Sequence, residues 1–289
     1  MAKSQSHTLG EFIGAFFEDL MKKPIREFAQ MHGLYFDTNC PRKARGGKKT
    51  LEWTDVHGNK HRLDFVIEEG GTEKEIGEPV AFIELAWRRY TKHSKNKAQE
   101  ISGAVNPICD KYKMTKPFKG AILSGDFTDN SLNQLKSEGF HVLYIPFVKM
   151  IQAFSVHGLE IDFDEDSKET DVKKKYAALK RRASKNVLER VREEIIKTCD
   201  TEIKQFISEL EASYTRKIKN ICILPLHGRR MEVCNVDKAI SYIENYENLP
   251  EDSKIEYIEI IITYNNGSII QGQFRSKLES VDFLKTIRK

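Results

Sequence analysis

Two acidic residues in the first third of the chain have the types and spacing of a metal site. Asp64 lies in the segment RLDFVIEE, and Glu84 ends the apolar run VAFIE twenty positions later. A carboxylate within an apolar strand is costly to bury unless it is paired or bound to a metal ion. Two carboxylates on neighbouring strands can hold Mg²⁺, which takes hard oxygen ligands, and the backbone carbonyl of Leu85 is a further candidate ligand.

Basic residues follow Glu84 directly, where a phosphate held by the metal ion would lie. The segment RRYTKHSKNK at residues 88–97 has five Lys and Arg residues and no acid. A metal ion polarises a phosphodiester and lowers the pKa of a bound water, and a nearby Lys or Arg stabilises the negative transition state. The pattern therefore predicts metal-dependent phosphodiester chemistry. The alternative is that Asp64 and Glu84 form salt bridges with Arg62 or Arg88.

The strands and helices predicted around the two acids form an α/β fold, a mixed sheet with helices on its faces. Apolar alternation and continuous apolar runs predict the strands, and Ser94 is a good helix N-cap. Residues 9–32 have a helical pattern in which Pro24 is expected to open a second helix. The elements expected next are a hairpin of residues 51–56 and 60–69, a strand at 79–87, a helix at 95–112, a strand at 118–127, a helix at 128–139, a strand at 140–147 and a short helix at 148–158.

The rest of the chain is expected to form a second domain. The acidic stretch at residues 160–171 predicts a boundary, with domains at residues 1–166 and 167–289. Apolar residues from Val172 to Leu210 recur every three or four positions, which predicts one amphipathic helix of roughly forty residues, on the order of 60 Å long. A small α+β unit follows, in which Asn266-Gly267 between two β-rich runs is typical of a hairpin turn.

Asp64, Glu84 and the order of elements around them resemble the restriction-endonuclease-like nuclease superfamily, known by its PD-(D/E)xK signature. Type II restriction endonucleases are the nearest likeness, and the resemblance covers about residues 9–160. It implies a restriction-endonuclease-like core and Mg²⁺-dependent cleavage of phosphodiester bonds, usually in DNA, with Mn²⁺ as a substitute. A restriction or phage-defence role would follow.

The sequence departs from this signature at two positions. Leu63 replaces the proline, which many members of the superfamily lack. Ala86, on the same strand face as Glu84, replaces the lysine. Either the role of the lysine has moved to Lys92 or Lys97, or Ala86 is an engineered change that disables the enzyme, or the fold has lost catalysis and kept nucleic-acid binding.

Other residues are candidates for accessory roles. Glu18 lies on the first predicted helix, where an acid approaches the metal site in some relatives, and His93 flanks the site as a possible proton shuttle. Three basic segments, at residues 41–49, 88–97 and 173–185, are suited to a phosphate backbone. The candidate nucleic-acid contacts are Arg88, Arg89, Lys95, Gln99, Lys48, Lys49, Arg181 and Arg182.

Composition limits the remaining possibilities. The chain has 289 residues, is 39% hydrophobic and 31% charged, and has a net charge of +4, which is typical of a soluble globular protein. Its apolar runs are too short to span a membrane, and its N-terminus lacks the apolar core of a secretory signal. Five cysteines without zinc-like spacing indicate reduced thiols. We therefore expect a cytoplasmic protein without a membrane partner.

Double-stranded DNA is the expected partner, together with a second copy of the chain or the other subunits of a defence complex. In a homodimer, two sites would reach both strands of a duplex. The second domain would then serve dimerisation, DNA recognition or partner binding. Two alternative functions remain open from the sequence, a catalytically inactive nucleic-acid-binding subunit and an RNA-directed nuclease.

Overall fold

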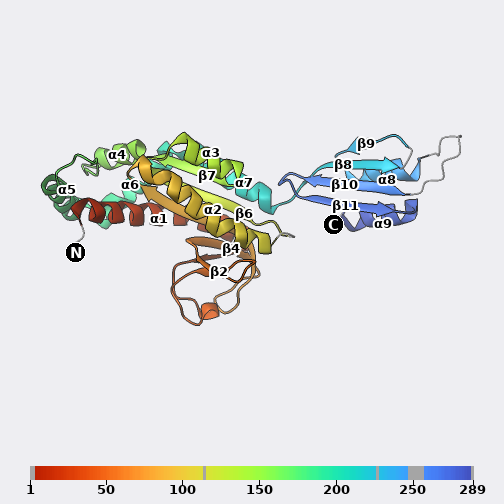
Figure 1. Cartoon of the computed structure of the whole chain (residues 1–289), viewed down its shortest axis with the longest axis horizontal. Coiled ribbons are helices and arrows are strands. Elements are labelled where there is room, and N and C mark those ends of the chain that lie inside the picture. The colour runs from red at the N-terminus through yellow and green to blue at the C-terminus, as the bar shows by residue number, and fades with distance from the viewer. Residues whose placement is uncertain (1–3, 113–114, 226–227, 247–256, 288–289) are drawn as a thin grey trace. The chain divides into compact units, whose positions relative to one another are not determined.

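The computed structural model describes residues 4–112, 115–225, 228–246 and 257–287 (Figure 1). The chain divides into two compact units, Met1–Leu210 and Glu211–Lys289. The first unit thus extends beyond the boundary expected near residue 166, because two helices and most of a third after that point belong to it. No helix in the described part of the chain combines the length and the apolar character needed to cross a membrane.

A five-stranded mixed sheet forms the centre of the first unit, which confirms the predicted α/β class. β4 pairs antiparallel with β1 and β5, while β5, β6 and β7 run parallel. β5 is therefore the strand at which the sheet changes from antiparallel to parallel pairing. The strands, in their order across the sheet, are β1 (Tyr35–Thr38), β4 (Phe65–Glu69), β5 (Glu78–Arg88), β6 (Phe118–Gly125) and β7 (His141–Pro146).

Helices cover both faces of this sheet, as Figure 1 shows for α1 (Gln5–Met31) and α2 (Ser94–Lys111). Phe82 and Ala86 of β5 share one buried cluster with residues of α2 and of α3 (Asp129–Ser137). Alternate residues of a strand point to opposite faces, so Trp87 lies on the other face, where it approaches Gly10 of α1. α4 (Phe147–Val156) follows β7 directly, as predicted.

α1 is a single helix, so the expectation that Pro24 opens a second helix is wrong. Pro24 lies inside α1, with buried apolar residues on both sides of it. A proline inside a helix removes one backbone hydrogen bond and costs roughly 3 kcal/mol. Burial of Leu20, Met21, Ile25 and Phe28 along one continuous face offsets this cost.

The single long helix expected after the acidic stretch is also wrong. Three helices occupy this region, α5 (Glu169–Arg182), α6 (Lys185–Thr198) and α7 (Asp200–Tyr214). The Ser184 hydroxyl caps α6 by accepting a hydrogen bond from the backbone N–H of Val187. The helices contact different parts of the first unit, since α5 packs on α1 and α6 on α4. The apolar spacing predicted helical structure correctly, but it did not reveal the two breaks between the helices. These breaks allow the three helices to pack against different parts of the first unit.

The predicted hairpin about residues 57–59 is confirmed, with β2 (Glu52–Thr54) paired to β3 (Lys60–Arg62). The Asp55 carboxylate accepts backbone hydrogen bonds from His57 and Asn59 at the turn. The expected strand at residues 60–69 is interrupted, however, because β3 ends at Arg62 and β4 begins at Phe65. Asp64 therefore lies in a bend before β4 and not within a hairpin strand, which corrects its expected position.

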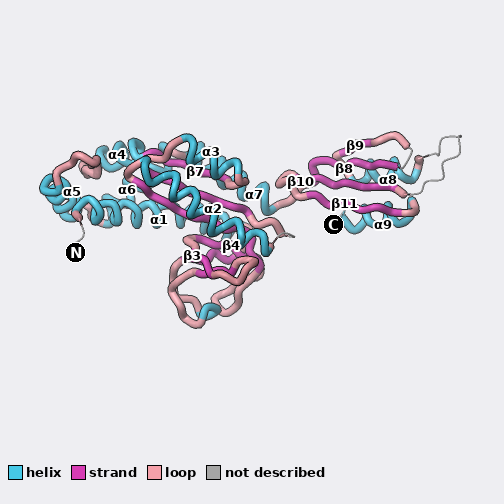
Figure 2. Tube along the Cα trace, viewed as in Figure 1, coloured by secondary structure: helices cyan, strands magenta, loops and turns pink. Residues whose placement is uncertain are grey.

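The second unit is the small α+β unit that the sequence predicts (Figure 2). Its antiparallel sheet has the order β11-β10-β8-β9, and two hairpin–helix segments follow one another along the chain. The sequence predicts a strand at residues 219–226, a helix at 237–247 and a hairpin at 255–274 in this unit, and residues 226, 247 and 255–256 of these lie outside the described residues. The elements are β8 (Ile218–Pro225), β9 (Met231–Val233), α8 (Val236–Glu244), β10 (Ile258–Tyr264), β11 (Ile269–Phe274) and α9 (Lys277–Ile287).

Part of the basic segment at residues 41–49 is internal. The Arg42 side chain is 2% exposed and donates hydrogen bonds to Asp37 at 2.6 Å and to both carboxylate oxygens of Glu68 at 2.7 and 2.9 Å. It also bonds to the backbone carbonyls of Thr72 and Glu75. This arginine therefore holds β1, β4 and the loop after β4 together.

Arg42→Met should lower the free energy of unfolding by about 3–5 kcal/mol, because it leaves the buried Glu68 carboxylate without its cationic partner. Urea denaturation followed by circular dichroism would measure the change. Lys48→Met, at an exposed position in the same segment, is the matched control and should stay within about 0.5 kcal/mol of the wild type. Equal effects of the two substitutions would contradict the structural role of Arg42.

Gly125→Ala should destabilise the first unit by about 3 kcal/mol or more. Gly125 has φ +103°, and an added Cβ would lie 1.9 Å from the backbone carbonyl oxygen of Arg88. Gly103→Ala is the control, because Gly103 is exposed on α2 and its Cβ would meet nothing within 4 Å. Thermal unfolding should show the control unchanged or slightly stabilised.

Candidate functional site

The two acids meet where the pairing between β4 and β5 stops. Phe65 and Ile83 form the last pair of this antiparallel ladder, while β5 continues beside β6 as far as the pair Arg88 and Gly125. Beyond Ile83, two carboxylate side chains accept backbone hydrogen bonds in place of a neighbouring strand. The backbone N–H of Leu85 donates to Asp64 Oδ2 at 2.8 Å, and the backbone N–H of Asp64 donates to Glu84 Oε1 at 3.3 Å.

Both carboxylates lie in surroundings that disfavour negative charge. Glu84 is 6% exposed, and Asp64 is half-buried. Burial raises the pKa of Glu84, and the nearby charge of Asp64 raises it further, to about 8. Burial also raises the pKa of Asp64, against the hydrogen bond from Leu85. The pair is therefore short of positive charge, which a bound cation would supply.

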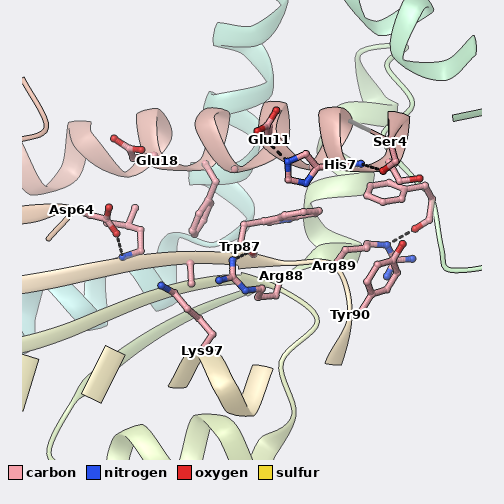
Figure 3. Close-up of a pocket in the computed structure, with 17 residues that line it drawn as sticks. Ser4, His7, Glu11, Glu18, Asp64, Trp87, Arg88, Arg89, Tyr90 and Lys97 are labelled. Atoms are coloured by element: carbon pink, nitrogen blue, oxygen red, sulfur yellow. Dashed lines mark hydrogen bonds and ion pairs between the residues drawn. The ribbon is translucent and has the colours of Figure 1, made fainter. Parts of the chain in front are cut away.

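Of the two lysines predicted to replace the missing one, the structure brings Lys97 to the acids. Lys97 lies in the first turn of α2 with its side chain 11% exposed, and its positive charge lowers the pKa of both Asp64 and Glu84. Figure 3 shows it directed from α2 toward β5. Its Nζ also bonds to Glu100 Oε1 at 2.7 Å.

Lys92 has a different environment. Its side chain is 61% exposed, and its Nζ lies 2.6 Å from Glu165 Oε1. It also lies over the ring of Tyr90. Lys92 thus interacts with the loop before α5, whereas only Lys97 of these two lysines affects the pKa of the acids.

A pocket of about 540 Å³ adjoins the acids, and Asp64, Leu85, Ala86 and Lys97 line it. Glu18 of α1 lines the same end, as Figure 3 shows, and its charge raises the pKa of Asp64. The Glu18 carboxylate forms an ion pair of 3.0 Å with Lys22 on the same helix. The structure therefore brings the accessory acid predicted from the sequence into the surroundings of Asp64.

The donor atoms suit a hard divalent cation. Asp64 and Glu84 offer carboxylate oxygens, and the Leu85 carbonyl is directed to the same side of β5 as its N–H, which bonds to Asp64. Within the described ranges, no group of three or more His, Cys, Asp or Glu side chains is arranged to hold a metal ion. Mg²⁺ nevertheless needs only one or two carboxylates, because it keeps several waters.

Arg88 and Arg89, two of the four arginines predicted to contact nucleic acid, are half-buried and line the pocket. Arg88 Nη1 donates to the backbone carbonyl of Trp87 at 2.9 Å. Arg89 pairs with Asp126, donates to the carbonyl of Phe163 and lies 4.9 Å from the ring centroid of Phe147. The Arg89 guanidinium thus connects the end of β5 to two neighbouring segments.

The other predicted contacts lie away from this pocket. Arg182 has one weak contact, to the backbone carbonyl of Gly158 at 3.4 Å. The side chain of His93 is outside the described residues. The residues that are exposed and do not line the pocket are Lys48, Lys49, Lys95, Gln99, Arg181 and Arg182.

Sequence reasoning missed the half of the pocket that comes from the start of α1. Ser4, His7, Gly10 and Gly14 line it opposite Trp87. Gly10 and Gly14 are four residues apart and so lie on one helix face, a spacing that could have indicated close approach of another segment. The N-terminal helix is therefore part of the site and not only a cover for the sheet.

Comparisons of the chain with protein-family models, with curated proteins and with solved structures found no match. The resemblance to the restriction-endonuclease-like superfamily therefore stays a prediction. What the structure does establish is an α/β unit in which Asp64 and Glu84 lie next to each other, and in which Lys97 lines the same pocket as Asp64.

Proposed function

We propose that the first unit is a Mg²⁺-dependent nuclease that hydrolyses phosphodiester bonds in DNA and acts in restriction or phage defence. The observation that carries this proposal is the pair of carboxylates, Asp64 and Glu84, at the end of the β4–β5 ladder, with Lys97 in the same pocket as Asp64. Mn²⁺ would substitute for Mg²⁺, because both cations accept an all-oxygen ligand set.

Each residue has a role that follows from its position. Asp64 and Glu84 provide the ligand oxygens, and a divalent cation bound there would supply positive charge to the phosphate and acidify a water. Lys97 stabilises the negative charge that develops on the phosphate during cleavage. The contact with Glu100 orients the Lys97 ammonium group at the start of α2.

The position of Lys97 supports the idea that the lysine role has moved. Ala86 is buried in a cluster that includes Ala98 of α2, on the sheet face that Glu84 shares. A lysine from the first turn of α2 reaches this face without occupying position 86. The structure thus offers a physical reason why alanine at this position is compatible with catalysis.

One observation favours a second candidate, a nucleic-acid-binding subunit without catalysis. Asp64 and Glu84 each accept a hydrogen bond from a backbone N–H, so they also have a structural role where β4 begins. Titration calorimetry with Mn²⁺ separates the two candidates. If Asp64 and Glu84 were purely structural, the wild type and the Glu84→Ala variant would bind the same number of Mn²⁺ ions. Parallel assays with DNA and RNA would address the third possibility, an RNA-directed nuclease.

Glu84→Ala should reduce Mg²⁺-dependent cleavage of plasmid DNA by at least about 10³-fold, because it removes a ligand of the cation. DNA binding in the presence of a chelator should change little. Glu78→Ala, at the exposed start of the same strand, is the matched control and should cut normally. Cleavage that persists in Glu84→Ala would refute the catalytic assignment.

Lys97→Ala should lower the cleavage rate by about 10²–10³-fold, whereas Lys92→Ala should stay within about threefold of the wild type. The physical reason is that, of these two lysines, Lys97 lines the pocket beside Asp64 and its charge lowers the pKa of both acids. Adding Ala86→Lys to the Lys97→Ala variant should restore part of the rate, because it returns an ammonium group to the same sheet face. Single-turnover kinetics would measure all three, and loss of activity in Lys92→Ala alone would show that Lys92 has the role instead.

A further inference from the structure

The pocket beside the acids continues well beyond them. From Asp64 and Lys97 it extends between α1 and the end of β5 to an aromatic end lined by Trp87, Tyr90 and Phe163 (Figure 3). Its volume of about 540 Å³ is in the range of pockets that enclose small organic ligands, roughly 300–1,000 Å³. A cation and one phosphate would occupy only the acidic end, so the aromatic end needs its own explanation.

Trp87 has a buried donor without an acceptor. Among the residues that the structure describes, its indole Nε1 has no hydrogen-bond partner. A buried indole N–H usually finds an acceptor, since leaving it unpaired costs free energy. The ring itself is held in place, at 5.9 Å between centroids from Phe147 and 6.3 Å from Phe163.

The α1 wall of the pocket is close to Trp87 at Gly10 and open at Gly14. Gly10 lets α1 approach the Trp87 ring, because a Cβ there would lie 3.0 Å from Cζ3. Gly14 also lines the pocket, and a Cβ at that position would meet nothing within 4 Å. The space beside Gly14 is therefore open, between the acidic end and the aromatic end.

We propose that the aromatic end of this pocket binds one unpaired nucleobase of the substrate, next to the phosphate held at Asp64 and Lys97. A nucleobase offers a flat face to the aromatic rings that line this end of the pocket. This inference rests on the proposed nuclease function and specifies its substrate.

The geometry makes a stacked base pair a poor ligand. β5 forms one wall of the pocket and α1 forms the other, so a base must leave its stack to enter between them. Unstacking costs least for a base that is single-stranded, mismatched or at an end. The inferred substrate is therefore DNA with an unpaired nucleotide at the reacting position.

A binding experiment in the presence of a chelator tests this inference without cleavage. The probes are two single-stranded chains of about twelve residues, one of thymidylate and one of abasic sites, with equal charge. The wild type should bind the thymidylate chain about tenfold more tightly. Gly14→Leu should remove this preference, because its side chain fills the open space, while affinity for the abasic chain stays the same.

Gly103→Leu is the matched control, a glycine-to-leucine change at an exposed position on α2 with nothing within 4 Å. Leucine has a higher helix propensity than glycine, so both variants should fold, and their thermal unfolding would show this.

Trp87 fluorescence gives a second measurement. In a Trp53→Phe background, Trp87 is the one tryptophan of the chain, and its fluorescence should change with the thymidylate chain but not with the abasic chain.

The outcomes separate this inference from the proposed function. Equal binding of both probes by the wild type, or an unchanged preference in Gly14→Leu, overturns the nucleobase site even if Mg²⁺-dependent cleavage is present. A base preference that Gly14→Leu removes, in a protein that cuts no DNA, supports the nucleobase site and overturns the nuclease. Absence of binding to either probe at low salt overturns the nucleobase site, while the nuclease is judged separately by Mg²⁺-dependent cleavage of plasmid DNA.

Discussion

The late start of β4, at Phe65, is the constraint on which the candidate site depends. β5 is held on one side by parallel pairing with β6 up to Arg88, but its antiparallel partner stops at Phe65. Backbone donors beyond that point need acceptors, and the carboxylates of Asp64 and Glu84 supply them. The same hydrogen bonds that complete the sheet edge fix two acids side by side, so the fold and the site share one set of contacts.

Much of the first unit follows from apolar patterning, because strands and amphipathic helices have characteristic periods. Asp64 and Glu84 were identifiable as acids in strand-like contexts. The breaks near Ser184 and Cys199 were not identifiable, since the apolar period continues through both. Pro24 was misleading because proline is a local signal for a helix boundary. In the structure, the burial of apolar side chains along α1 outweighs this signal.

The choice between Lys92 and Lys97 shows what one sequence cannot decide. Both lie in the same basic run, and only the start and phase of α2 determine which ammonium group faces the sheet. The basic segment at residues 41–49 is a similar case. A count of positive charge includes Arg42, whose guanidinium is buried against two carboxylates, together with Lys48 and Lys49, which face solvent.

The two walls of the pocket differ in how firmly they are anchored. On the β5 side, the Arg88 carbonyl accepts the backbone N–H of Asp126 at 2.7 Å, and Asp126 in turn pairs with Arg89. On the α1 side, the first turn is tied to α5 by an exposed carboxylate, Glu169, which accepts a 2.7 Å hydrogen bond from the Ser6 hydroxyl. Exposed contacts of this kind exchange readily with water. The start of α1 therefore depends partly on hydrogen bonds that water can replace, together with the buried side chains of Leu9 and Ile13, whereas the end of β5 is held by backbone hydrogen bonds.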